Sequence, residues 1–119
     1  MEVAIYDKSG KPHAYIAYED DKTIYLWGGK PVAYLDGEHV FGFNGKHLGW
    51  FDNGIMYDGQ GERVGFTKQT CPSVTQVEQV KSVKHVKHVK SVQQVAPRKL
   101  IFSLGYSTLD LSVLLEGGY

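Results

Sequence analysis

The sequence has one cysteine, few prolines, no net charge and no long apolar run. Cys71 alone cannot close a disulfide within the chain, which excludes a small disulfide-stapled secreted fold and predicts a reducing compartment. No stretch approaches the roughly 20 apolar residues of a membrane helix, and residues 1–4 lack the charged start of a signal peptide. We therefore expect a cytoplasmic protein without membrane association.

The overall neutrality hides two halves of opposite charge. Residues 1–70 contain seven basic and ten acidic residues, whereas residues 71–119 contain six basic and three acidic ones. The first half is also the part rich in glycine and aromatic residues, which favours short strands and tight turns over helices. The two halves are therefore expected to be structurally different.

The first half is an internal repeat built around four glycines. Each has an aromatic residue four positions before it and another five positions after it, and a small residue precedes the second aromatic. The glycines are Gly10, Gly29, Gly45 and Gly61, the first aromatics are Tyr6, Tyr25, Phe41 and Tyr57, and the second aromatics are Tyr15, Tyr34, Trp50 and Phe66. Such recurrence at a spacing of 16–19 residues indicates a repeat architecture.

Each repeat unit has the pattern of a β-hairpin. The dipeptides that end in the four glycines lie between apolar runs, and we interpret them as two-residue hairpin loops with positive φ. Further turn sequences separate the hairpins, so a mainly β meander of about eight short strands is expected. The small residues Ala14, Ala33, Gly49 and Gly65 suggest that four backbones converge around a pseudo-four-fold axis.

These residues resemble a known family. The segment from Ile24 to Leu35, followed by Phe43 to Trp50, is similar to the bacterial four-fold beta flower domain. The resemblance covers residues 4–68 and implies four hairpin petals. It brings no established activity and no catalytic, cofactor or ligand residues.

The second half begins with a period of three. After Pro72, a valine stands at every third position from Val74 to Val95. This period matches polyproline II, in which the valines form one stripe along an extended segment. An α-helix is the alternative, because lysine and glutamine are good helix formers. We expect an extended segment, polyproline-II-like or strand, whose valine edge is buried against the flower or against another copy of the chain.

The remaining residues predict a short C-terminal unit. Residues 98–104 read as a strand, and residues 107–116 as a short helix with Leu111, Leu114 and Leu115 on its apolar side. The predicted organisation is thus a flower domain over 1–70, a valine-triplet segment over 71–97, and a C-terminal strand and helix over 98–119.

The sequence offers no catalytic constellation. His85 and His88 would share a face only on a helix, and an extended segment holds them too far apart to chelate one ion. Cys71 has no base partner in the sequence pattern and is interpreted as an incidental thiol. We predict no enzyme activity, no cofactor and no metal.

Two features remain as candidate binding residues. One is a lysine stripe, and the other is the tryptophan outside the repeated aromatic positions. They are Lys81, Lys84, Lys87, Lys90 and Trp27. The lysines would attract a polyanion such as nucleic acid, or they would solvate the segment and pair with the acidic flower. Trp27 and its neighbouring aromatics would stack on a base or a sugar ring.

The leading hypothesis is a non-enzymatic scaffold or interaction module that forms a homo-oligomer through the valine-triplet segment. Polyanion or nucleic-acid binding by the lysine stripe is the first alternative. Binding of a carbohydrate or another small molecule by the flower aromatics is the second.

Overall fold

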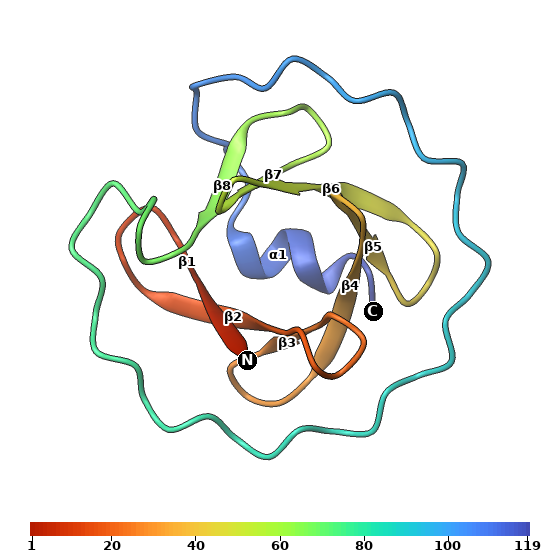
Figure 1. Ribbon diagram of the computed structural model, residues 1–119, viewed down its shortest axis with the longest axis horizontal. Coiled ribbons are helices and arrows are strands. Elements are labelled where there is room, and N and C mark those ends of the chain that lie inside the picture. The colour runs from red at the N-terminus through yellow and green to blue at the C-terminus, as the bar shows by residue number, and fades with distance from the viewer.

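Eight antiparallel strands close into a barrel in the computed structural model, which describes residues 1–119 (Figure 1). Each strand pairs with the next, and the last returns to the first where Phe66 lies opposite Tyr6. The strands are β1 (Glu2–Tyr6), β2 (Pro12–Ala17), β3 (Thr23–Leu26), β4 (Pro31–Asp36), β5 (His39–Gly42), β6 (His47–Asp52), β7 (Ile55–Tyr57) and β8 (Arg63–Phe66). One helix, α1 (Leu111–Glu116), follows. The predicted mainly β fold with a short C-terminal helix is confirmed.

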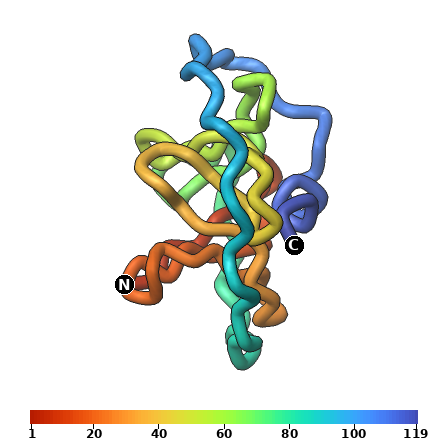
Figure 2. Tube along the Cα trace, turned by 90° about the vertical axis from the view of Figure 1, so that its right-hand side faces the viewer, coloured from red at the N-terminus to blue at the C-terminus, as the bar shows by residue number.

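The inside of the barrel is aliphatic. Because successive side chains of a strand point to opposite faces, every second residue points inward. Helix α1 lies over one end of the barrel, and its Leu111 and Leu115 are at most 2% exposed (Figure 2). Full burial of a leucine contributes about 1.5–3 kcal/mol. The core consists of Ile5, Ala14, Ile16, Ile24, Val32, Ala33, Leu35, Val40, Leu48, Met56, Val64, Leu111 and Leu115.

The outside of the barrel carries pairs of aromatic residues. The second aromatic of one repeat unit lies directly opposite the first aromatic of the next unit. The pairs are Tyr15 with Tyr25, Tyr34 with Phe41, Trp50 with Tyr57, and Phe66 with Tyr6. Nearly all of these rings are buried although they lie outside the barrel, so something else must cover them.

The four glycine turns differ from the two-residue loops that we predicted. In each turn the glycine amide donates to the carbonyl oxygen three residues earlier, as Gly10 does to Asp7 and Gly45 does to Gly42. The residue before the glycine has negative φ in every turn. The strand register shifts near the end of the strand that leads into the turn. This is the geometry of a longer turn closed by a glycine bulge, which needs only one residue with positive φ.

A long segment without helix or strand encircles the barrel (Figures 1 and 2). We call residues 73–103 the belt. Its backbone contacts the four glycine turns at nine-residue intervals, one turn after another. Gln76, His85, Gln94 and Ser103 donate their amide protons to the carbonyl oxygens of Gly10, Gly29, Gly45 and Gly61. Successive contacts between the belt and the four glycine turns are thus nine belt residues apart.

The expectation that the valine edge packs against the flower is wrong. The eight valines are 87–95% exposed and point away from the barrel. The reason is that the belt is held by its backbone and by its lysine and glutamine side chains. The outer face of the barrel carries aromatic rings and carboxylates, which match lysine better than valine.

The predicted strand over residues 98–104 is also absent. A closed barrel has no free edge to which another strand could add. This segment instead completes the belt, with the ring of Phe102 stacked 3.9 Å from that of Tyr57.

The C-terminal helix is shorter than predicted, because Ser107 does not cap it. The Ser107 hydroxyl donates to the Asp58 carboxylate at 2.5 Å and accepts the Leu109 amide proton. Helix α1 begins at Leu111, and Gly117 follows its last residue as predicted.

Candidate functional site

The outer edge of the belt is the most unusual surface of the molecule. We call Val74, Val77, Val80, Val83, Val86, Val89, Val92 and Val95 the valine rim. The backbone under this rim is neither helix nor strand, and most of its amide groups make no hydrogen bond to the barrel. The rim therefore combines exposed apolar side chains with backbone amide groups that have no partner in the barrel.

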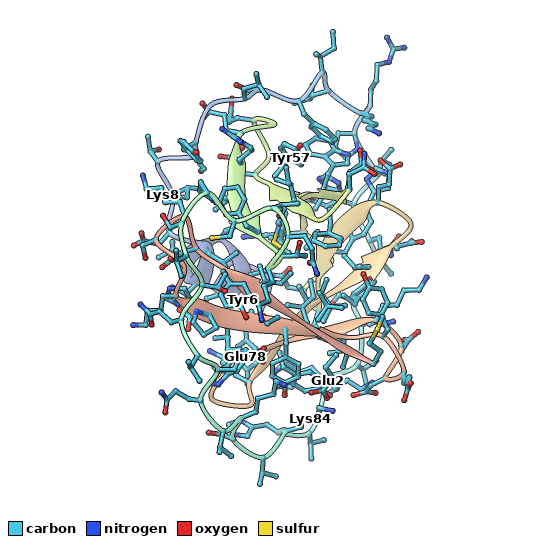
Figure 3. The ribbon with its side chains drawn as sticks, turned by 60° about the vertical axis from the view of Figure 1, so that its left-hand side comes forward. Glu2, Tyr6, Lys8, Tyr57, Glu78 and Lys84 are labelled. Atoms are coloured by element: carbon cyan, nitrogen blue, oxygen red, sulfur yellow. The ribbon has the colours of Figure 1, made fainter.

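The lysine stripe faces the other way, toward the acidic loops of the barrel. Each ammonium group lies near a carboxylate: Lys84 is 2.8 Å from Glu2, Lys87 is 2.7 Å from Asp20, and Lys90 is 2.5 Å from Asp21. Figure 3 shows Glu2 and Lys84 together at one side of the molecule. The remaining lysine, Lys81, lies 3.3 Å from Glu2.

Three of these lysines cover rings of the first two aromatic pairs. The Lys81 ammonium lies 5.0 Å from the centre of the Tyr15 ring, and that of Lys90 lies 4.1 Å from the centre of the Tyr34 ring. Lys84 lies 5.4 Å above Tyr25. These distances are typical of cation–π contacts. Tyr15, Tyr25 and Tyr34 therefore lie under the belt and do not form an open stacking platform.

The ion pairs shift the acidity of the carboxyl groups. The hydrogen bond from Lys84 lowers the pKa of Glu2, and those from Lys87 and Lys90 lower the pKa values of Asp20 and Asp21. Burial, followed by its hydrogen bond to Asp20, raises the pKa of Tyr25. All three carboxylates are thus charged at neutral pH and hold the belt electrostatically.

Trp27 lies beside a cavity. Its Nε1 donates to the carbonyl oxygen of Gln79 in the belt at 3.1 Å, and its ring meets that of Tyr15 edge to face. One side of Trp27 borders a cavity of about 360 Å³, which Pro12, His13 and Gln76 also line.

The glycines singled out from the repeat act as contact points for the belt. At Gly10, Gly29 and Gly45, a side chain would begin about 2 Å from the carbonyl oxygen of Val74, Val83 or Val92. Sequence reasoning missed this role because it read the belt only in triplets. The nine-residue period is present in the sequence as the serines at positions 73, 82 and 91.

A pair of histidines was also missed. His39 Nδ1 lies 2.9 Å from His47 Nε2, next to Trp50 and beneath the belt. Burial, together with the nearby His39, lowers the pKa of His47 to about 4. The two residues are eight positions apart, and only the pairing of β5 with β6 brings them together.

The structure holds no cluster of three or more histidine, cysteine or acidic residues in a metal-binding arrangement. His88 lies beside the ring of Tyr119, and the Cys71 thiol donates to the carbonyl oxygen of Asp7. None of the helices has the length and apolar character needed to cross a bilayer.

Comparison with known proteins identifies the family. No curated protein and no solved structure matches the chain. A family model described as 4-fold beta flower protein matches residues 3–115, which include the barrel, the belt and most of α1. The resemblance inferred from residues 4–68 is therefore confirmed and extends through the second half, and the chain belongs to the 4-fold beta flower protein family.

Proposed function

We propose that the protein is a non-enzymatic scaffold that associates with a second copy of itself through the valine rim. The single observation that carries the proposal is the exposure of all eight valines, at 87–95% each, along one continuous edge of the belt. Complete burial of a valine side chain contributes about 1.5–3 kcal/mol, so even a few rim valines would supply substantial association energy.

The belt backbone supports the same proposal. The amide groups of Val77, Val80, Val86 and Val89 make no hydrogen bond to the barrel. Two belts lying side by side would pair such groups and bury valines from both copies, as in β-strand addition. The lysines would not obstruct this contact, because they point to the barrel and are already paired with carboxylates.

We further propose that the four hairpin units of the barrel are arranged with pseudo-four-fold symmetry. It is supported by the four equivalent aromatic pairs and by the nine-residue steps of the belt. In such an arrangement the rim would present similar surfaces in several directions. One chain would then be able to contact more than one neighbour, as a scaffold requires.

Polyanion binding by the lysine stripe is less favoured. The four lysines would have to leave the carboxylates of Glu2, Asp20 and Asp21 before they reached a phosphate backbone. Carbohydrate stacking on Tyr15, Tyr25 and Tyr34 is less favoured as well, because lysines of the belt cover these rings.

Sedimentation velocity of the full chain tests the proposal. We expect concentration-dependent association in the micromolar range, and its loss when Val80, Val83, Val86 and Val89 are replaced together by threonine. Threonine keeps the branched shape but replaces one methyl group of each valine by a hydroxyl. The matched control is Leu104→Thr, an apolar residue that is 84% exposed outside the rim. A wild-type chain that stays monomeric, or an effect of the control equal to that of the valine changes, would overturn the proposal.

A further inference from the structure

A second cavity lies where the first glycine turn meets the C-terminal segment. Its volume is about 380 Å³, a size that suits a small molecule. The walls come from the turn between β1 and β2, from β8, and from residues 107–112. Lys8, which Figure 3 labels, stands at this side of the molecule.

Three permanent cations border this cavity and have no acidic partner. Lys8, Lys11 and Arg63 form no ion pair with any carboxylate, in contrast to the belt lysines. The ring of Tyr106 lies under two of them, 5.7 Å from the Lys8 ammonium and 4.4 Å from the Arg63 guanidinium. The Nε of Arg63 is buried without a hydrogen-bond partner.

The acidic residues at the cavity offset these charges only in part. Asp7 is occupied, because its Oδ1 accepts hydrogen bonds from Ser9 and from the Lys11 amide while its Oδ2 lies 2.7 Å from His13 Nε2. Asp110 is the other carboxylate in the wall, and it makes no capping hydrogen bond to α1. The cavity therefore keeps a net positive charge.

The wall also supplies neutral donors. The hydroxyls of Ser9, Thr108 and Ser112 line the cavity together with His13. A doubly charged group with several acceptor oxygens would use separate cations and hydroxyls together, and guanidinium is well suited to such a group. A phosphate group presents more acceptor oxygens than a carboxylate does, so it can use more of these cations and hydroxyls at once.

We propose that this cavity binds the phosphate group of a small phosphorylated molecule. The proposal is independent of self-association through the valine rim, which lies on the belt. Lys8 and Lys11 would contact the phosphate oxygens directly. Arg63, packed against the Tyr106 ring, would add positive charge to the wall of the cavity.

The test is an NMR titration of the full chain with inorganic pyrophosphate at low salt, with sodium chloride of equal ionic strength as the blank. We expect saturable shifts confined to residues 7–13, 63–66 and 107–112. In Lys8→Gln/Lys11→Gln, loss of two charge-assisted hydrogen bonds should weaken binding about tenfold or more. Asp110→Asn removes a like charge and should tighten binding.

The matched control is Lys46→Gln. Lys46 follows Gly45 as Lys11 follows Gly10, but it does not border the cavity. Its replacement should leave the affinity unchanged, and thermal unfolding should show that all variants are folded. Absence of saturable shifts in the wild type, or equal weakening by Lys46→Gln and by Lys8→Gln/Lys11→Gln, would overturn the proposal.

Discussion

The carbonyl oxygen of Val92 lies 2.1 Å from the point where a side chain on Gly45 would begin. Gly45 has a φ of +87°, so the turn that closes β5 and β6 and the belt that crosses it both depend on the absence of a side chain. The same relationship joins Val83 to Gly29 and Val74 to Gly10. At Gly61 the nearest atoms are those of Leu100, at an ordinary contact distance of 3.6 Å.

Gly45→Ala should therefore destabilise the protein more than Gly61→Ala. Both changes incur the cost of a left-handed residue with a side chain, roughly 1–2 kcal/mol. Only Gly45→Ala also displaces the belt, which should add on the order of 1–3 kcal/mol of overpacking. Urea unfolding measures both variants. Equal losses would mean that the belt does not rest on the turns.

Most of the barrel could be predicted from sequence, whereas the belt could be predicted only in part. The spacing of glycine and aromatic residues is local, and it indicated the turns and about eight strands because a hairpin is determined by neighbouring residues. The orientation of the valines depends on what the belt contacts. Its partners, such as Glu2 and Asp20, lie more than 60 residues away, and no local pattern links them to Lys84 and Lys87.

The small residues illustrate the same limit. The spacing singled out Gly49 correctly, but it suggested that backbones meet at a central axis. The structure shows a different cause: a side chain at Gly49 would begin 2.0 Å from the carbonyl oxygen of Tyr57 in the adjacent strand. At Gly65 the neighbours are the side chains of Ile5, Met56 and Leu111.

Gly49→Val should consequently be costly. A branched side chain would push β7 away from β6, and overpacking of this kind costs about 1–3 kcal/mol. Lys46→Val, in the turn before the same strand, is the control, because Lys46 is exposed and forms no ion pair. Thermal unfolding compares the two. A Lys46→Val variant as unstable as Gly49→Val would contradict the role assigned to Gly49.

The half-buried pair of His39 and His47 predicts a pH dependence. The pKa of His47 is about 4 in the folded chain, below its ordinary value of 6.5, so the unfolded chain binds the proton more readily between these values. The free energy of unfolding should fall as the pH decreases from 7 to 5. We expect a loss of about 1 kcal/mol, because partial exposure of the ring to solvent reduces the effect.

Urea unfolding at pH 7 and pH 5 measures this dependence above the range in which the paired carboxylates titrate. His47→Gln should reduce the difference between the two pH values. His88→Gln, at an exposed position of the belt, should leave it unchanged. A His47→Gln variant with the wild-type pH dependence would show that another group is responsible.

Removal of a belt lysine should loosen the belt locally while the barrel stays intact. Lys84→Met loses both the ion pair with Glu2 and the contact with the Tyr25 ring. Contacts of this kind at a surface contribute about 1 kcal/mol or less, and salt screens the ionic part. Ser82 and His85 flank Lys84 in the belt, and their amides donate to the carbonyl oxygens of Trp27 and Gly29. These two amides report the change. Their protection from hydrogen exchange should fall by up to about fivefold.

The Gln94 amide, which donates to Gly45 farther along the belt, is the internal reference and should keep its protection. Lys46→Met removes a lysine without any ion pair and is the control for loss of charge alone. Added salt should bring the wild type toward Lys84→Met at Ser82 and His85 by weakening the ion pair with Glu2. If protection at these two amides were unchanged in Lys84→Met, the belt would be held by its backbone hydrogen bonds to the turns, and the lysine contacts would follow from that position instead of causing it.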